Sequence, residues 1–286
     1  DPEAGGQRNL AGKLSYAFAY RLGVLAHTSI YSYDEYGKVE WIIQKIPGIA
    51  TKQIKYAYDL MGKVTMKSYL DFGNSTNNFY AFYEYDVANR LAKIFTDVNS
   101  SGSTKVREAE YSYTASGKVK QLKLGATPAQ TVDYSYTERD WLKQITSTKF
   151  SETLGYDNIA EIGSAQSAEP QYNGNISWMK YQMTGVNYSH PEPQVTTDLL
   201  GYTYTYDKSN RLTKSDFGYY GYNGESTDWW PSDAFDIKEI KYDSSGNIRS
   251  MQRYGKNWSM MDNLVYNHYP ASNRGMSQTW LIGRSS

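Results

Sequence analysis

The sequence predicts an all-β protein, built as an array of stacked antiparallel β-hairpins in a sheet that curves or spirals. Three observations predict this fold class. Tyrosine accounts for 29 of the 286 residues. The tyrosines recur at regular steps, each time in front of turn-forming residues. The segments between the turns alternate in polarity as strands do, and no segment has the periodicity of a long helix.

Seven stretches align without gaps and share the pattern Tyr-Asp-x-x-Gly-(Lys/Arg)-aliphatic, and six of them carry another Tyr two positions earlier. The first five begin 25, 27, 28 and 23 residues apart. Such a step holds two strands of about 5–10 residues with their turns, so each repeat predicts one hairpin. A single hairpin is marginally stable in water, so the hairpins are expected to stack. The stretches are 33–39, 58–64, 85–91, 113–119, 136–142, 206–212 and 242–248.

Substitutions within the pattern identify a type I turn followed by a left-handed residue. Asp or Thr at the second position can accept a hydrogen bond from a backbone N–H ahead of it. Gly, Asn or Asp at the fifth position tolerates a positive φ angle. The predicted structural turn residues are Asp34, Gly37, Asp59, Gly62, Asp86, Asn89, Gly117, Asp207, Asn210, Asp243 and Gly246.

The paired tyrosines before each turn predict aromatic ladders. Side chains two positions apart in a strand point to the same face, so rings from neighbouring hairpins can stack. The repeat also accounts for much of the charge balance of the chain, because Lys or Arg follows the left-handed position in five of the seven copies and Asp opens the turn in five.

Weaker copies at 9–14, 156–159, 172–176 and 269–274 extend the pattern, and Asn173-Gly174 carries a strong two-residue hairpin signal. We therefore expect residues 1–286 to form one repeat array, interrupted by insert loops at about 187–199 and 217–236. The array begins in mid-repeat and shows no cap at its end, so we expect it to be an excerpt of a longer protein.

Composition excludes several classes of protein. Lys plus Arg is 30 and Asp plus Glu is 30, which removes the positive charge expected of a nucleic-acid binder. No apolar run reaches the roughly 18 residues of a membrane span. The absence of cysteine excludes disulfides, thiol nucleophiles and thiolate metal sites.

The residues suggest no catalytic chemistry. His27, His190 and His268 lie far apart and lack metal-ligand spacing, and no nucleophile motif is present. The recurring aspartates are explained as turn residues. We therefore expect no enzyme activity, no catalytic or metal-binding residues and no cofactor.

One group of residues could bind a ligand. Tyr219, Tyr222, Trp229 and Trp230 cluster in the longest interval between repeats, and exposed aromatic rings are surfaces on which sugars stack. The alternative is a long hairpin whose aromatic side chains pack over the sheet, which fits the usual burial of large aromatic residues.

The tandem Tyr-Asp-x-x-Gly pattern resembles the YD repeat of the Rhs family. The stretches 171–177 and 201–207 are most similar to secreted YD-repeat proteins of Bacteroidetes-type bacteria. The resemblance implies a β-hairpin shell, secreted or on the surface of a bacterium, that encloses or presents another polypeptide such as a toxin. Its partners would be the remainder of a longer chain or an enclosed cargo. The alternative function is a carbohydrate-binding adhesion module that uses the exposed aromatic residues.

Overall fold

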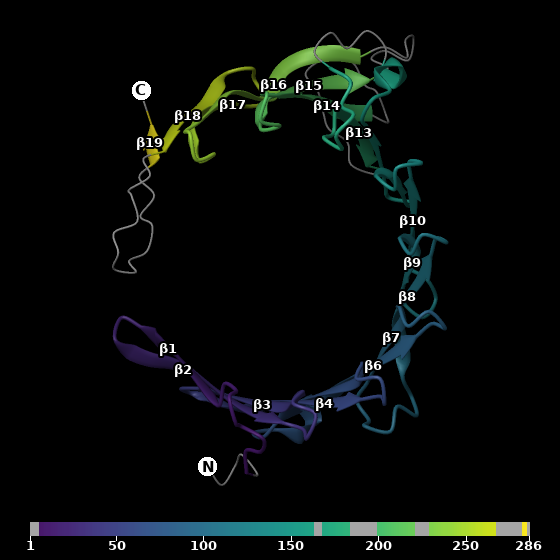
Figure 1. Cartoon of the computed structure of the whole chain (residues 1–286), viewed down its shortest axis with the longest axis vertical. Coiled ribbons are helices and arrows are strands. Elements are labelled where there is room, and N and C mark those ends of the chain that lie inside the picture. The colour runs from purple at the N-terminus through teal and green to yellow at the C-terminus, as the bar shows by residue number, and fades with distance from the viewer. Residues whose placement is uncertain (1–5, 163–167, 184–198, 221–228, 267–281, 285–286) are drawn as a thin grey trace. The chain divides into compact units, whose positions relative to one another are not determined.

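The computed structural model describes residues 6–162, 168–183, 199–220, 229–266 and 282–284 (Figure 1). These residues form 19 strands, and every strand whose pairing is described is antiparallel to its neighbour in the chain. The helical structure there is limited to two 3₁₀ turns, η2 (Ser75–Asn77) and η3 (Ile159–Ile162). The all-β hairpin fold predicted from the sequence is therefore confirmed. No described helix has the length and hydropathy required to cross a membrane.

The chain divides into two compact units, 1–131 and 132–286, which are described separately. In the first unit each strand pairs with the next from β1 to β9. Its strands are β1 (Tyr16–Arg21), β2 (Val24–Tyr33), β3 (Val39–Ile46), β4 (Ile49–Tyr58), β5 (Val64–Asp71), β6 (Phe79–Tyr85), β7 (Leu91–Asp97), β8 (Val106–Tyr113) and β9 (Val119–Leu124).

The second unit begins within β10 and is also a meander in which each strand pairs with the next. Its strands are β10 (Gln130–Tyr136), β11 (Leu142–Thr146), β12 (Phe150–Gly155), β13 (Trp178–Met183), β14 (Leu199–Tyr206), β15 (Leu212–Tyr220), β16 (Trp229–Tyr242), β17 (Ile248–Tyr254), β18 (Met260–Tyr266) and β19 (Ile282–Arg284).

The repeat turns within each unit all lie at one end of the strands. In a meander the connections alternate between the two ends of the sheet, and the Tyr-Asp turns occupy every second connection. We call this end the YD edge. Each regular turn is followed by a bulge in the next strand, as where Tyr33 pairs with Val39 while Ser32 pairs with Trp41, which leaves Glu40 without a partner in the register. A type I turn followed by a left-handed residue and a bulge is a common three- to five-residue hairpin connection.

The two weak copies at 156–159 and 172–176 were expected to be separate, and this expectation is wrong. Gly155 pairs with Trp178 in the register that Ser32 and Trp41 adopt in a regular repeat. Tyr156 therefore opens and Ile176 closes a single repeat, whose turn is expanded by the residues between them. Asn173-Gly174 lies inside this connection and does not join two paired strands directly.

The expanded turn folds into a small core of its own. Ile162, Ala168 and Trp178 are buried together, and Ile159 of η3 packs against them. The Trp178 indole N–H donates to the carbonyl of Asn158 at 3.0 Å. Elsewhere the buried apolar residues also form small local clusters, such as Ile30, Trp41 and Ile43 in the first unit and Leu200, Phe217 and Ala234 in the second.

The structure describes part of one expected insert. Of residues 217–236, the first four extend β15 and the last eight lie in β16, so these parts are strand and not loop. The remainder, 221–228, lies outside the described residues, as does the other expected insert up to residue 198.

Candidate functional site

The repeat turns share one pattern of hydrogen bonds. The second-position side chain accepts from the backbone N–H four residues later, as Asp34 Oδ1 does from Lys38 N at 2.8 Å. Threonine makes the same bond at greater length, 3.1 Å from Thr114 Oγ1 to Lys118 N. The same bond closes the turns that begin at Asp59, Asp86, Thr137, Asp207 and Asp243.

These bonds stabilise the charged carboxylates. The backbone N–H of Arg90 and its guanidinium lower the pKa of Asp86, and the Arg211 side chain and N–H lower that of Asp207. The side chain and N–H of Asn247 lower the pKa of Asp243. These three aspartates are therefore held as anions by the turns that they close.

The fifth position of each turn is left-handed. Four turns use Gly there, with φ between 82° and 88° at Gly37, Gly62, Gly117 and Gly246. The other three use residues that tolerate this region, with φ of 65° at Asn89, 60° at Asp140 and 61° at Asn210. The structure also contains a turn of this form that the pattern did not identify, in which Gly255 replaces the Asp and Trp258 takes φ of 59°.

Consecutive hairpins are joined by a recurrent bond from the tyrosine that opens each turn. Its hydroxyl donates to the carbonyl of the aliphatic residue that closed the turn before, as Tyr58 does to Val39 at 2.7 Å. The bond is present at seven junctions: Tyr33–Leu14, Tyr58–Val39, Tyr85–Val64, Tyr113–Leu91, Tyr156–Leu142, Tyr206–Ile176 and Tyr242–Leu212, with distances of 2.5 to 2.9 Å.

The hydrogen bond from the tyrosine hydroxyl lies just beyond the last backbone pair between two consecutive hairpins. At the β3–β4 junction the last pair toward the YD edge is Trp41 with Lys55, two residues after Val39 and three before Tyr58. Five further junctions end at these same positions. The side-chain bond therefore extends the connection between hairpins beyond the last backbone pair.

The Lys or Arg of the repeat stacks on the tyrosine of the following repeat. Lys38 Nζ lies 5.2 Å from the centre of the Tyr58 ring, and the Arg90 guanidinium lies 4.4 Å from that of Tyr113. Each contact of this kind is worth about 0.5–1 kcal/mol at an exposed site. The other examples are Lys13 on Tyr33, Lys63 on Tyr85 and Arg211 on Tyr242. From the sequence, the recurring Lys or Arg was explained only by charge balance. Its fixed position after the left-handed residue was nevertheless a signal that could have indicated a structural contact.

The junction tyrosines are held as neutral donors. Burial is the main cause that raises the pKa of Tyr58, Tyr85, Tyr113, Tyr206 and Tyr242. A tyrosine hydroxyl is protonated at neutral pH even with its ordinary pKa, and only the protonated form can donate, so the raised pKa of these tyrosines extends the junction bond to more alkaline pH.

Replacing Tyr58 with phenylalanine is expected to lower the free energy of unfolding by about 0.5–1.5 kcal/mol, because it removes one hydrogen bond and leaves the ring and its stacking on Lys38 in place. Urea denaturation followed by circular dichroism measures the change. Tyr36→Phe is the matched control, since this ring is 78% exposed and its change should stay within about 0.5 kcal/mol. Equal effects of the two substitutions would contradict the role of the Tyr58 hydroxyl.

Alkaline pH is expected to unfold the protein as the tyrosines ionise. Because the folded pKa values of buried tyrosines such as Tyr58, Tyr85 and Tyr202 lie above the ordinary value of 10.0, the stability that these residues contribute is complete below pH 10.0 and is lost as pH rises through the raised values. Burial raises the pKa of Tyr202 to about 12, so the loss should extend toward that pH. Tyrosinate absorbance and circular dichroism should change together, whereas titration of all the tyrosines with a midpoint at pH 10.0 and without unfolding would contradict this expectation.

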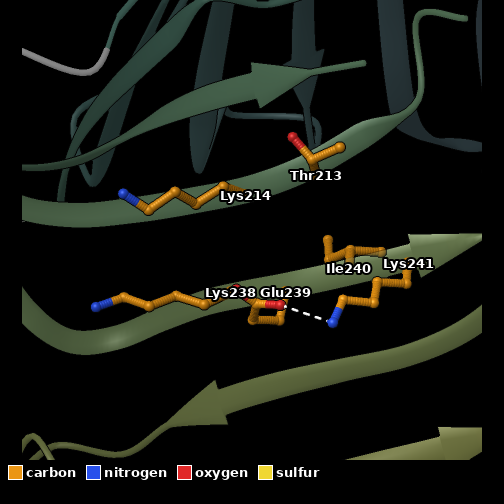
Figure 2. Close-up of a pocket in the computed structure, with 6 residues that line it drawn as sticks. All are labelled: Thr213, Lys214, Lys238, Glu239, Ile240 and Lys241. Atoms are coloured by element: carbon orange, nitrogen blue, oxygen red, sulfur yellow. Dashed lines mark ion pairs between the residues drawn. The ribbon is translucent and has the colours of Figure 1, made fainter.

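The β15–β16 junction departs from the regular arrangement. Its last pair toward the YD edge is Ser215 with Ile237, and β16 has left-handed residues at Phe235 and Glu239. The strands separate beyond this pair and leave a cavity of about 330 Å³ (Figure 2). It is lined by Thr213 and Lys214 of β15 and by Lys238, Glu239, Ile240 and Lys241 of β16.

The lysines at this cavity are each paired with carboxylates. Lys241 Nζ lies 3.0 Å from Glu239, as Figure 2 shows, and Lys214 Nζ lies 2.8 Å from Asp216. Lys238 Nζ contacts Asp233 at 2.7 Å and Asp236 at 3.1 Å. The positive charges are compensated locally, so the cavity is a gap in the ladder and not a strongly cationic site.

Asp236, in β16 beside this gap, is a buried acidic residue. Its carboxylate is buried, and Oδ1 accepts from the Phe217 N–H at 2.7 Å. Burial raises the pKa of Asp236. Burial alone would lower the pKa of Lys238, but its hydrogen bonds to Asp233 and Asp236 outweigh that effect and raise it. Asp236 therefore replaces a backbone ladder bond at the bulge of β16.

Three of the four predicted aromatic binding residues lie in β15 and β16. Tyr219 pairs with Trp230, and Tyr220 pairs with Trp229. The Tyr219 ring packs edge-on against Phe217, with centroids 5.2 Å apart, and belongs to the periphery of the buried cluster there. The backbones of Trp229 and Trp230 lie in β16, while Tyr222 lies outside the described residues.

Of the three histidines, His27 alone lies in the described part of the chain. His27 hydrogen-bonds Ser29 Oγ at 3.1 Å, and His190 and His268 lie outside the described residues. Within those residues no group of three or more His, Asp or Glu side chains is placed to hold a metal ion.

Comparisons with known proteins returned structures only. No protein-family model and no curated protein matches the sequence. Among solved structures, TcdB2-TccC3-Cdc42 covers 88% of this chain at 13% identity with a TM-score of 0.37, and the Photorhabdus luminescens Tc holotoxin pore covers 91% at 14% identity with a TM-score of 0.37. A porin-like protein from Bacteroides uniformis covers 72% at 12% identity with a TM-score of 0.28.

This chain spans 13% and 17% of the length of the two toxin chains that it matches, and 86% of the porin-like chain is covered. The array itself has the features that the resemblance to YD-repeat proteins implies: tandem Tyr-Asp turns, one hairpin per regular repeat, and a long antiparallel sheet.

Proposed function

We propose that this chain is a non-enzymatic structural segment of a secreted or cell-surface bacterial YD-repeat protein. It would form part of a shell wall that encloses or presents another polypeptide, such as a toxin. The observation that supports this function best is the recurrence of one linkage, from the tyrosine hydroxyl to the preceding aliphatic carbonyl, at seven junctions.

A shell wall requires contacts that connect each hairpin to the next. The most regular residues of the repeat make these contacts. Asp closes the turn, the aliphatic carbonyl accepts from the next Tyr, and Lys or Arg covers that ring, as Asp34, Val39 and Lys38 do toward Tyr58. Arrays whose units contact only their neighbours grow by adding repeats without changing the design. We propose that residues 1–286 form one such array within a longer chain, whose other repeats and cargo are its partners.

Electron microscopy of the protein at its full native length tests the wall function. We expect a hollow or curved sheet, with an enclosed or attached polypeptide that resists added protease. Variants that weaken two junctions, Tyr58→Phe with Tyr85→Phe, should make that polypeptide more accessible, whereas Tyr36→Phe should not. A compact solid particle, with no polypeptide protected, would refute the proposal.

A second function, carbohydrate binding in adhesion, is favoured by the register of one hairpin. Tyr219 opposite Trp230 and Tyr220 opposite Trp229 are successive cross-strand pairs, so one aromatic pair belongs to each face of the hairpin. Either pair could offer a stacking surface for a sugar ring. A glycan array should then show binding that Trp229→Ala and Trp230→Ala abolish and that Tyr172→Ala, at another exposed ring, leaves unchanged. No signal, or the same signal in all variants, would exclude this site.

A further inference from the structure

The two central positions of the repeat turns differ between the two units. In the first unit these positions are mostly apolar, and in the second they are polar or charged. The first-unit residues are Leu10, Ala11, Glu35, Tyr36, Leu60, Met61, Val87, Ala88, Ala115 and Ser116, and those of the regular second-unit turns are Glu138, Arg139, Lys208, Ser209, Ser244 and Ser245. We call the central residues Tyr36, Leu60, Met61 and Val87 the apolar tips.

The turns do not need apolar side chains at these central positions in order to form. Leu60 and Val87 are fully exposed, and Tyr36 and Met61 are 78% and 69% exposed. Ser244 and Ser245 occupy the same positions in a turn with the same closing bond, from Asn247 N to Asp243 Oδ1 at 2.9 Å. Single exposed apolar residues are ordinary, but this group recurs on three successive turns of one edge.

The apolar tips form a row along the YD edge of the first unit. Successive Tyr-Asp turns are separated by two strands, or about 10 Å at the usual strand spacing. The tips at Tyr36, Leu60 and Val87 therefore stand about 10 Å apart, each as a projection of one or two side chains. Projections separated in this way do not make the continuous packed core that a protein interface usually has.

Cations stand directly behind the apolar tips. Lys38 Nζ lies 5.8 Å from the centre of the Tyr36 ring as well as 5.2 Å from that of Tyr58. The aspartates of these turns are engaged by the backbone, as Asp59 is by Lys63 N at 2.8 Å, and Arg90 is more exposed than its partner Asp86, 35% against 22%. The edge thus presents apolar projections, with Glu35 beside Tyr36, in front and Lys or Arg side chains behind.

We propose that the YD edge of the first unit docks on a lipid surface, with the apolar tips inserted among the acyl chains and the cations at the headgroup phosphates. A fluid layer accepts separate projections without matching their shape, Tyr is suited to the interface, and Lys or Arg near the surface favours anionic lipid. This inference does not depend on the wall function, since it concerns only the turn tips.

Vesicle flotation of the full chain tests the docking. The variant Leu60→Ser, Met61→Ser and Val87→Ser removes the apolar tips of two turns, and it should fold because Ser244-Ser245 already fills these positions in another turn. The matched control is Phe72→Ser with Val98→Ser, at exposed apolar residues of the opposite edge. Vesicles of phosphatidylcholine and of an equal mixture with phosphatidylglycerol are used, and circular dichroism verifies the fold of each protein.

We expect the wild type and the control variant to float with both vesicles, and more strongly with the mixed ones. The serine variant should partition at least about tenfold more weakly, since several apolar groups no longer leave water. Added salt should remove only the gain from phosphatidylglycerol. The proposal is overturned if the wild type does not float or if the serine variant floats equally. It is also overturned if the apolar tips instead cause self-association in sedimentation without lipid, since a protein partner would then occupy them.

Discussion

Trp178→Ala is expected to lower the free energy of unfolding of the second unit by about 3–5 kcal/mol, the range for truncating a buried tryptophan. The Trp178 side chain is 1% exposed and joins β13 to the expanded turn through Ile162 and Ala168. Its indole N–H also donates to the carbonyl of Asn158, which the substitution leaves without this donor. Chemical denaturation of the full chain, followed by circular dichroism, measures the loss.

A substitution at Gly155 tests whether the Trp178 indole fills the space beside this glycine. It pairs with Trp178 across β12 and β13, and a Cβ at this position would overlap the indole ring. Gly155→Ala should therefore cost about 1–3 kcal/mol in the wild type, as other overpacking substitutions do. In the Trp178→Ala background the same change should be neutral or favourable, because the methyl group enters the space that the indole left. An equal cost in both backgrounds would show that the two residues do not compete for this space.

Gly62→Val is the second substitution with a large expected effect, a loss of about 2–3 kcal/mol. Gly62 has φ of 85°, a region in which a β-branched residue is strongly disfavoured. A side chain there would also displace the Lys38 ammonium group, which lies against this glycine and over the Tyr58 ring. The midpoint of thermal unfolding should fall accordingly.

Two further variants separate backbone strain from general damage to the turn. Gly62→Asn should cost about 1 kcal/mol or less, because Asn89 takes φ of 65° at the same place in the next repeat and accepts a hydrogen bond from Lys63. Met61→Val changes an exposed central turn position and should stay within about 0.5 kcal/mol. If all three variants had equal stability, the left-handed conformation of residue 62 would not be the cause of the effect.

Most of the hairpin array could be predicted because its turns are local. The Asp34 carboxylate and Gly37 act within a stretch of five residues, so a single repeat is enough to predict their turn. The recurrence of the pattern then predicts the number of regular hairpins. The expanded repeat could not be predicted in this way. Its two ends, Tyr156 and Ile176, are brought into register by the pairing of β12 with β13, which local turn signals do not encode.

The candidate ligand site was less predictable than the fold. The sequence places Tyr219 and Trp230 in the same interval, but only pairing between β15 and β16 puts them opposite each other and packs Tyr219 beside Phe217. The gap between these strands had no signal in the sequence, since it results from bulges at Phe235 and Glu239, two residue types that rarely take positive φ.

The turns of this protein, their period, and the alternating polarity of the strands between them could all be predicted from local sequence. Each of these depends on side chains and backbone within a few residues of one another. The contacts of the repeated Tyr and of the repeated Lys or Arg, by contrast, depend on how the hairpins pair. Tyr58, for example, contacts Val39 and Lys38, which lie about 20 residues earlier in the chain. The Val39 carbonyl reaches the Tyr58 hydroxyl, and the Lys38 ammonium group reaches the Tyr58 ring, because two hairpins pair in one register. Contacts of that kind arise from strand pairing, so they appear only when the sheet is assembled.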